Sequence, residues 1–367
     1  MVYRVIGLMS GSSLDGLDIA FAELQENGGK WQYEIIAADC YSYSEELKNR
    51  LKNAISLNAL DYQLLHVDYG HYLGRQVNHF IEEKELQYQV SLIASHGHTT
   101  FHVPAKKMTA QLGDGAAIAS ETQLPVVTDL RALDLALGGH GAPIVPIGEK
   151  LLLGNYDYFL NLGGIANISI NRDHYVAFDI CAANRVLNML ANDVGKEYDK
   201  DGEMAAQGKL NEQLLEKLDQ LDYYRHSYPK SLANDFGTDI VYPIIKKENI
   251  AVNDALRTYV EHIALQIKKA IADPKATGSR LSAPNSTLLA TGGGALNKFM
   301  VDIIKSQLHE LNVEVVVPDH NLVNFKEALI MGLIGVLRWR QEYNVLSSVT
   351  GALRDSIGGA LWLGQEA

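Results

Sequence analysis

One short stretch near the N-terminus combines glycines, serines and carboxylates, VIGLMSGSSLDGLDIAFAEL at residues 5–24. Its two apolar runs, separated by a turn, predict a strand, a turn and a second strand. Gly7, Gly11 and Gly16 would keep side chains away from a ligand, so that backbone N–H groups face phosphate oxygens. The stretch therefore indicates a phosphate-binding hairpin. An ordinary tight hairpin, with Asp and Gly as turn residues, is the alternative.

Polar side chains of the same turn add to this chemistry. The hydroxyls of Ser10, Ser12 and Ser13 can face phosphate oxygens and donate to them. The carboxylate of Asp15 or Asp18 can hold a metal ion, usually through water. The turn is not a Walker loop, because no Gly-Lys-Ser/Thr follows and a strand rather than a helix comes next.

A second hairpin and a later glycine-rich turn repeat the pattern. YFLNLGG followed by IANISI, within residues 156–170, again reads as strand, glycines and strand. ATGGGALN at residues 290–297 runs from a buried strand through three glycines into a helix, where bare backbone lets an adenine or ribose lie against it. The duplicated hairpin predicts two domains of the same architecture that face a nucleotide between them.

Polar residues also follow two buried strands of the first half. His96 and Gly97 come after one, and Arg131 comes after the next. Ligands in α/β proteins bind at the carboxyl ends of strands, and the planar fork of an arginine matches a carboxylate or a phosphate. The alternatives are incidental loop histidines, and an arginine paired with Asp129 or Asp134.

Asp179 is the candidate general base. We expect a strand over 176–179, with Asp179 at its end, and a helix over 183–194. A carboxylate beside a helix N-terminus is well placed to take a proton. The alternative is that it serves as a helix cap or turn residue.

Composition excludes several classes of protein. The chain has 367 residues, 47% of them hydrophobic and 21% charged, and a net charge of -12. The negative charge argues against nucleic-acid or anionic-membrane binding. Two cysteines are too few for a disulfide framework or a zinc site. With no leader and no long apolar run, we expect a cytoplasmic protein. Further strands are expected at 31–42 and 313–317, and helices at 45–57, 61–83, 253–271 and 325–340.

Nine segments together resemble one family, the anhydro-N-acetylmuramic acid kinases of the actin, sugar kinase and Hsp70 ATPase superfamily. They cover nearly the whole chain and are GLMSGSSLDGLDIAF, ASHGHTT, QLGDG, DLRALDLALGGHGAPIVP, NLGGIANIS, YDKDGEMA, PKS, ATGGGALN and SSVTGA. The resemblance implies a two-domain, actin-like (duplicated ribonuclease H-like) α/β fold with the nucleotide in the interdomain cleft. We place the N-terminal domain at 1–140 and the C-terminal domain at 141–367.

The resemblance also implies a reaction. Members of the family use ATP and Mg²⁺ to open the 1,6-anhydro bridge of anhydro-N-acetylmuramic acid with water and to phosphorylate O6. The product is N-acetylmuramic acid 6-phosphate, in peptidoglycan recycling and amino sugar metabolism. The alternatives are a kinase acting on another amino sugar, and an ATP-binding regulatory protein without turnover. The family further suggests a homodimer.

Site residues follow from the resemblance position by position. Asp179 would be the catalytic base, Arg131 would bind the lactyl carboxylate of the sugar, and Asp15 would hold the metal. His96, Gly97 and Glu327 would lie near the substrate. The nucleotide contacts would be Gly11, Ser12, Ser13, Leu14, Asp15, Gly16, Leu17, Asp18, Asn161, Gly163, Gly164, Asn167, Gly292, Gly293 and Gly294.

The chain departs from the family in the segment after the base. Where the family typically reads Asp-Thr-Gly-Pro, a small residue and Asn, this sequence has Asp179-Ile180-Cys181-Ala182-Ala183-Asn184. The aspartate and the asparagine are kept. We expect the loss of glycine and proline to shift the helix start, and the aspartate with it. A second departure is His98, where glutamine is common.

Overall fold

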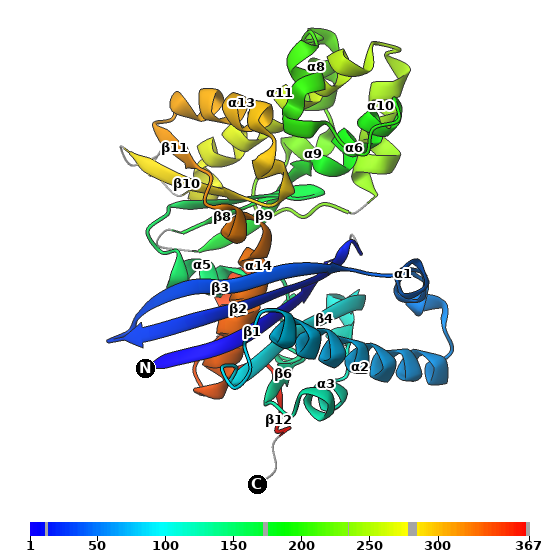
Figure 1. The fold of residues 1–367 in the computed structure, drawn as a ribbon. Helices are drawn as coiled ribbons and strands as arrows, with labels where there is room; N and C mark the ends of the chain where they lie inside the picture. The colour runs from blue at the N-terminus through cyan, green and yellow to red at the C-terminus, as the bar shows by residue number, and fades with distance from the viewer. Residues whose placement is uncertain (12–13, 172–174, 234, 278–284, 365–367) are drawn as a thin grey trace. The chain divides into compact units, whose positions relative to one another are not determined.

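The chain forms two compact units, each with a mixed sheet and helices packed on it (Figure 1). The computed structural model describes residues 1–11, 14–171, 175–233, 235–277 and 285–364. The first unit is Met1–Leu153 with Phe325–Ala367, and the second is Gly154–Asn324. This division differs from the expected one at residue 140, because the C-terminal strand returns to pair with a strand of the first unit. No helix in the described ranges is both long and apolar enough to cross a membrane.

The first unit is built on a seven-stranded sheet in the order β12-β6-β4-β1-β2-β3, with β5 paired to β4. Its strands are β1 (Val2–Ser10), β2 (Gly16–Asn27), β3 (Lys30–Ser42), β4 (Leu92–Val103), β5 (Met108–Leu112), β6 (Val126–Thr128) and β12 (Ala360–Trp362). The first three form the expected antiparallel meander. Strand β4 runs beyond its predicted end at Ser95, because it leaves its parallel partner β1 near His98 and continues as a hairpin with β5.

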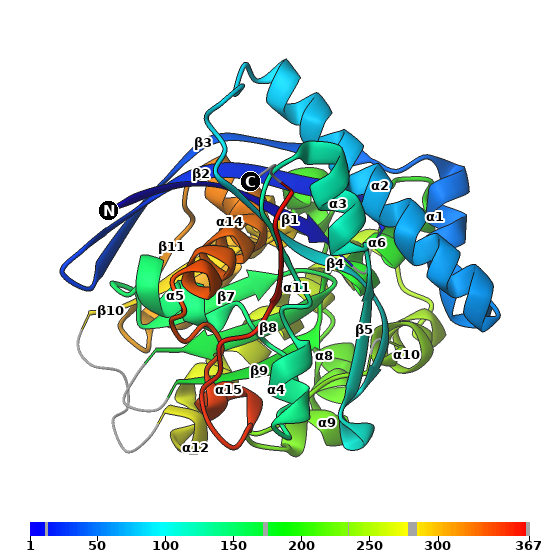
Figure 2. The ribbon, with the colours of Figure 1, turned by 90° about the horizontal axis from the view of Figure 1, so that it is seen from below.

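Helices cover both faces of this sheet (Figure 2). They are α1 (Glu45–Lys52), η1 (Ala54–Ser56), α2 (Ala59–Glu83), η2 (Pro104–Lys106), α3 (Gly115–Thr122), α4 (Ala132–Ala136), α5 (Pro146–Leu152), α14 (His320–Trp339, whose first residues belong to the second unit) and α15 (Ser347–Thr350). Ile6 and Leu8 of β1 share a core with Tyr69 and Leu73 of α2. Gly7, on the opposite face of β1, lies against α14. The alternation of β1 side chains thus separates the two helical layers.

Two glycines of the first hairpin are explained by packing rather than by a ligand. A Cβ at Gly7 would overlap the carbonyl of Ala328 on α14. A Cβ at Gly16 would lie 2.8 Å from the sulfur of Cys40 on β3. Neighbouring elements already occupy the space of a side chain at both positions, so packing alone requires glycine there. The nucleotide contact expected at Gly16 stays a prediction. The close approach of Gly7 to Ala328 also brings Glu327, the residue before Ala328 on α14, near the hairpin.

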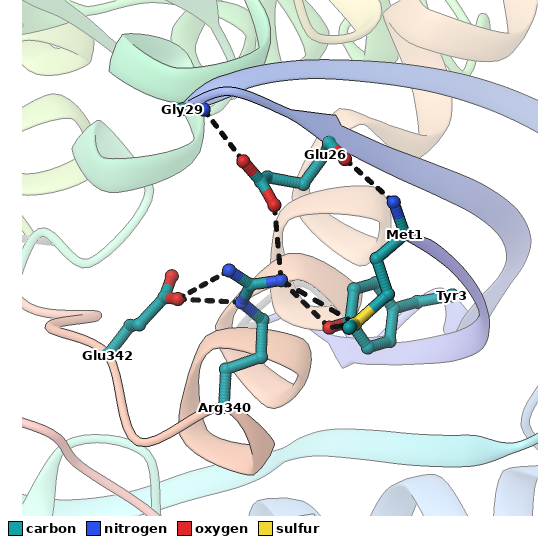
Figure 3. A network of polar contacts seen from close by, with 6 residues as sticks. All are labelled: Met1, Tyr3, Glu26, Gly29, Arg340 and Glu342. Atoms are coloured by element: carbon teal, nitrogen blue, oxygen red, sulfur yellow. Dashed lines mark hydrogen bonds and ion pairs between the residues drawn. The ribbon is translucent and has the colours of Figure 1, made fainter.

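The far end of the first hairpin is tied to the end of α14 by a polar network (Figure 3). Arg340 donates to the hydroxyl of Tyr3 at 2.8 Å and pairs with Glu26 at 3.4 Å and with Glu342 at 2.6 Å. The N-terminal ammonium of Met1 donates to the carbonyl of Glu26 at 2.8 Å. Hydrogen bonds to these acceptors raise the pKa of Arg340. These contacts fix α14 lengthwise along β1.

The second unit holds a five-stranded sheet in the order β11-β10-β7-β8-β9. Its strands are β7 (Tyr158–Leu162), β8 (Ile165–Ile170), β9 (Val176–Ala182), β10 (Ser286–Thr291) and β11 (Val313–Val316). Its helices are α6 (Asn184–Asn192), η3 (Lys200–Gly202), α7 (Glu203–Gln207), α8 (Glu212–Asp219), α9 (Asp222–Arg225), the π-helical turn η4 (Phe236–Val241), α10 (Tyr242–Lys247), α11 (Val252–Ala272), α12 (Pro274–Thr277), η5 (Gly293–Leu296) and α13 (Lys298–His309). Helix α11 is the centre of the core and packs with α6 and α13.

Strand β9 is longer than the sequence predicts. It continues past Asp179 to Ala182, because Cys181 and Ala182 still pair with β8 beyond a register shift. Helix α6 begins at Asn184, and its N-cap position is Ala183. Asp179 is therefore neither the last residue of its strand nor a helix cap, and that part of the prediction was wrong.

Candidate active site

A buried hydrogen-bond chain fixes the start of the first hairpin turn. Tyr43 donates to the hydroxyl of Ser10 at 2.8 Å, and its own oxygen lies 2.7 Å from that of Tyr69. Ser10 also lies 3.3 Å from Nδ1 of His98. Burial raises the pKa of Tyr69 to about 12 and lowers the pKa of His98, so these groups are neutral near pH 7. The sequence indicates the Ser10 hydroxyl as a possible phosphate ligand. It does not show the contacts of Ser10 with Tyr43 and His98, because these partners are distant in the chain.

The turn itself is described in part. The amide of Leu14 lies 3.4 Å from the carbonyl of Gly11, and Leu14 has a left-handed backbone with a φ of 59°. The predicted phosphate ligands Ser12 and Ser13 lie outside the described residues. Leu17 is buried and pairs with Ser10 across the two strands.

Three carboxylates gather beside this turn. Burial raises the pKa of Asp18 to about 6, and the negative charges of Glu327 and Asp15 raise it further, against a hydrogen bond from Cys40 that lowers it. Burial also raises the pKa of Glu327. Asp15 is exposed at the turn. Helix α14 thus brings Glu327 to the hairpin, a proximity that the sequence does not show.

These carboxylates suit a hard divalent cation. Oxygen ligands are what Mg²⁺ prefers, and it is usually held by one or two carboxylates together with water and phosphate oxygens. Such an ion would relieve the repulsion that raises the pKa of Asp18. In the described part of the chain no group of three or more His, Cys, Asp or Glu side chains could hold a metal by itself. The donor set therefore fits an ion bound jointly with a phosphate ligand.

Arg131 is held by neutral acceptors. Its Nε donates to Nε2 of His96 at 2.8 Å, and its Nη1 donates to the carbonyl of Gly141 at 2.7 Å. Burial lowers the pKa of Arg131 to about 10, against the raising effect of Glu327 and Asp134, so the guanidinium stays charged at neutral pH. Its remaining N–H groups have no hydrogen-bond partner among the described residues.

The pairing of Arg131 with Asp129 or Asp134 does not occur. The carboxylate of Asp134 accepts from the amide of Gly141 at 2.7 Å and from the hydroxyl of Thr350 at 2.7 Å. The carboxylate of Asp129 accepts from the hydroxyl of Thr128. Arg131 therefore carries a half-buried positive charge that no carboxylate of the described chain neutralises by direct contact. This is the environment that a carboxylate ligand would complete.

The hydrogen bonds of His96 fix its tautomer. Its Nδ1 lies 2.9 Å from the carbonyl of Gly97 and must carry the hydrogen. Nε2 is then unprotonated and accepts from Arg131. Burial lowers the pKa of His96 to about 3, and the charge of Arg131 lowers it further. The neutral ring of His96 thus orients Arg131 and is not a general acid. Gly97 has a φ of 70° and packs on the carbonyl of Leu112, so packing alone requires glycine there.

The second hairpin and the glycine turn meet in the second unit. Strands β7 and β10 are parallel neighbours, with Asn161 opposite Thr291. A Cβ at Gly292 would lie 2.5 Å from the Asn161 side-chain oxygen, and one at Gly294 would lie 2.9 Å from that of Asn184. The side chains of these two asparagines thus lie against the glycine turn.

Other glycines of this region leave space. A Cβ at Gly163, Gly164 or Gly293 would meet only ordinary or distant contacts. This contrasts with Gly7 and Gly16, whose neighbours require glycine. The carbonyls of Gly163 and Gly164 accept from the amides of Asn184 and Ala183 and tie the hairpin to the start of α6. Glycines without a packing reason are candidates for close approach of a ligand.

Asp179 lies beside the second hairpin and is held by donors. It is the cross-strand partner of Asn167 on β8. Its Oδ2 accepts from the hydroxyl of Ser231 at 3.0 Å and from the amide of Leu232 at 2.9 Å. The backbone carbonyl of Asp179 accepts from the hydroxyl of Tyr223 at 2.7 Å. Oδ1 has no hydrogen-bond partner among the described residues.

The sequence could have indicated part of this arrangement. Ser231 lies in the PKS segment that contributes to the family resemblance, although no role was assigned to it. The neighbouring Lys230 places its ammonium 4.7 Å from the ring centre of Tyr223, whose hydroxyl donates to the carbonyl of Asp179. Nothing in the local sequence predicts that this segment reaches Asp179, which lies 52 residues earlier. One carboxylate oxygen is thereby fixed, and the other is left to accept a proton.

Comparison with known proteins gives consistent matches over the whole chain. A family model described as anhydro-N-acetylmuramic acid kinase matches residues 3–364. The anhydro-N-acetylmuramic acid kinase of Francisella tularensis subsp. novicida is 32% identical over 367 residues, covering 95% of each chain. That of Sulfurimonas denitrificans is 29% identical over 370 residues, covering 97% of this chain and 98% of the relative. Among solved structures, the activator of 2-hydroxyisocaproyl-CoA dehydratase from Clostridium difficile with bound ADPNP has a TM-score of 0.46 and 13% identity. The match covers 92% of this chain and 96% of the activator chain.

Proposed function

This chain belongs to the anhydro-N-acetylmuramic acid kinase family, and from that premise we propose the roles of its individual site residues. The protein is a sugar kinase with an α/β fold. It opens the 1,6-anhydro ring of anhydro-N-acetylmuramic acid with water and phosphorylates O6 from ATP, giving N-acetylmuramic acid 6-phosphate. The observation that carries the proposed roles is the charge of Arg131, which is held in place without a carboxylate partner.

Arg131 is proposed to bind the lactyl carboxylate of the sugar. Its Nε and one Nη1 hydrogen are engaged, while the other N–H groups are available to a planar anion. His96 accepts from Nε and so sets the plane of the guanidinium. Glu327 lies close enough to influence the pKa of both Arg131 and Asp18, and we propose that it acts near the sugar or the nucleotide.

Asp179 is proposed to be the general base. The attacking water must lose a proton as its oxygen bonds to the anomeric carbon and the bond from that carbon to O6 breaks. Oδ1 of Asp179 takes this proton, while Ser231 and Leu232 hold Oδ2. O6 then accepts the γ-phosphoryl group and ADP leaves. The segment that departs from the family, Ile180 to Ala182, continues strand β9 beyond Asp179.

ATP is proposed to contact residues of both units. In the first unit these are the hairpin residues from Gly11 to Asp18. In the second unit they are Asn161, Gly163, Gly164, Asn167 and the turn of Gly292, Gly293 and Gly294. We add Asn184, because its side chain lies against that turn. We propose that Asp15 and Asp18 hold Mg²⁺. When bound, Mg²⁺ would neutralise charge on the transferring phosphoryl group.

We further propose a homodimer that works in the cytoplasm, where ATP is available. Support for self-association comes from apolar side chains exposed along one side of α2, at Leu60, Leu64 and Val67. Ile55, which precedes this helix, is exposed as well. An exposed apolar stripe at helical spacing is typical of a protein contact.

The test of the proposed function is ADP release with product analysis. Purified protein with Mg-ATP is given 1,6-anhydro-N-acetylmuramic acid, other amino sugars, or no sugar. We expect ADP only with the anhydro sugar, and a product heavier by one water and one phosphoryl group. ADP with a different sugar alone would favour another sugar kinase. ATP binding without ADP release would favour the regulatory alternative.

A further inference from the structure

The C-terminal turn α15 reaches the loop that holds Arg131. The hydroxyl of Thr350 donates to Oδ1 of Asp134 at 2.7 Å. Thr350 is fully buried, and Asp134 is 1% exposed. The carbonyl of Thr350 accepts from the amide of His140 at 2.8 Å and from its Nδ1 at 2.7 Å. Thr350 lies in the SSVTGA segment, to which the proposed function gives no role.

A short chain of hydrogen bonds leads from Thr350 to Arg131. Asp134 accepts from Thr350 with one carboxylate oxygen and from the amide of Gly141 with the other. The carbonyl of the same Gly141 accepts from Nη1 of Arg131 at 2.7 Å. Because Asp134 is nearly inaccessible to water, its carboxylate depends on these two donors for its position.

The loop has little freedom to compensate for the loss of one contact. Gly141 has a φ of 66°, and a Cβ there would overlap Leu135. A Cβ at Gly139 would overlap the carboxylate of Asp134. A small movement of Asp134 would therefore move the Gly141 carbonyl, and with it the guanidinium that it orients.

We propose that Thr350 is a positioning residue that sets the orientation of Arg131 toward the carboxylate of the sugar. The inference rests on the proposed role of Arg131. A residue that only stabilises the fold would affect the binding of all sugars equally. Substitution of Thr350 should instead weaken only the binding of sugars that carry a carboxylate.

Thr350→Val is the test variant, since valine keeps the shape and removes the hydroxyl. Thr350→Ser keeps the hydroxyl and is the matched control. For each protein we would measure the KM for 1,6-anhydro-N-acetylmuramic acid and for ATP. We would also measure the inhibition constant of 1,6-anhydro-N-acetylglucosamine, which has the same bicyclic ring without the lactyl carboxylate.

We expect Thr350→Val to raise the KM for the carboxylate sugar roughly tenfold, as for a weakened hydrogen bond to a charged group. The KM for ATP and the inhibition constant of the sugar without the carboxylate should stay within about twofold. Thr350→Ser should behave as the wild type. If Thr350→Val does not fold, Thr350→Ala is given the same measurements.

Two results would overturn the inference while the proposed function stands. One is an unchanged KM for the carboxylate sugar in Thr350→Val. The other is an equal loss for both sugars, which indicates a purely structural role. Absence of sugar-dependent ADP release by the wild type would instead contradict the proposed function, and the inference with it.

Discussion

Arg131 and Asp179 carry opposite charges, lie in different compact units, and are held by opposite kinds of partner. Arg131 is surrounded by acceptors, the imidazole of His96 and the carbonyl of Gly141. Asp179 is surrounded by donors, among them the hydroxyl of Ser231. Neither side chain makes a direct ion pair within the described part of the chain.

The two environments show how a charge can be oriented without being neutralised. A carboxylate partner would hold Arg131 equally well but would compete with a carboxylate substrate. A lysine or arginine partner would hold Asp179 but would make it a weaker base. Neutral partners fix the direction of each group and leave its charge for the ligand. The partners differ in range, however. Those of Arg131 extend to Thr350, which is 216 residues away from Asp134 in the sequence, whereas Leu232 is only 53 residues away from Asp179. Each set lies within one unit.

Removing the charge of the base should have the largest effect. We expect Asp179→Asn to lower kcat about 10³-fold, because asparagine accepts no proton from water. ATP binding, measured by titration calorimetry, should change little. Asp193→Asn, which removes a surface carboxylate bonded to Tyr242 and Lys246, is the control and should keep full activity. Retained activity in Asp179→Asn would remove this residue from the mechanism.

Replacing Arg131 by lysine keeps the positive charge but removes the planar guanidinium, and so tests the role of Arg131 in the comparison. Arg131→Lys should raise the KM for the sugar between about 10- and 100-fold, because an ammonium cannot keep both neutral acceptors and bind a planar carboxylate. The KM for ATP should stay the same. Arg50→Lys alters an exposed pair with Asp68 and serves as the control. An unchanged KM for the sugar would show that Arg131 does not contact it.

Weakening a neutral partner of the base should have a smaller effect. Ser231→Ala removes one of two donors to Oδ2 of Asp179. We expect kcat to fall about tenfold, because the carboxylate loses one of the two donors that fix its orientation. Ser231→Thr, which keeps a hydroxyl, should restore the rate. An unchanged kcat in Ser231→Ala would mean that Ser231 does not position the base.

The smallest effect is expected on stability, through the pKa of His96. An unfolded histidine binds a proton near pH 6.5, whereas His96 does so only near pH 3 because of burial and the charge of Arg131. Between these values the unfolded chain binds more protons, so the free energy of unfolding falls as the pH falls. This contribution is fully present above pH 6.5.

Urea unfolding at pH 6.5 and pH 5 would measure this dependence. His96 should account for a loss of about 2 kcal/mol over this interval, and His96→Gln should lose that part of the pH dependence. His79→Gln, at an exposed histidine, is the control and should keep the wild-type dependence. An identical pH dependence in His96→Gln and the wild type would contradict the low pKa.

The sequence predicts the elements of the site better than their partners. Both hairpins, the glycine turn and the identity of Arg131 follow from residue type and local periodicity, which are short-range properties. The hydroxyls of Ser231 and Thr350 could not be assigned, because their contacts join segments that are distant in the chain.

The errors of the sequence interpretation have the same origin. The end of β9 was misplaced because its pairing with β8, and not a glycine or proline, decides where it stops. Gly7 is expected from the sequence to leave space for a ligand. In the structure it leaves space for Ala328, which lies on a helix near the C-terminus. The pairing of β12 with β6 also joins segments that are distant in the chain, so local sequence does not predict it.

The most direct test of the account is sugar-dependent ADP release with the mass of the product, compared between the wild type, Asp179→Asn and Arg131→Lys. The account predicts that wild-type protein converts 1,6-anhydro-N-acetylmuramic acid to a product heavier by one water and one phosphoryl group. It also predicts that Asp179→Asn loses turnover, and that Arg131→Lys needs more sugar to reach the same rate. A phosphorylated product that still contains the anhydro ring, or full activity in Asp179→Asn, would contradict it.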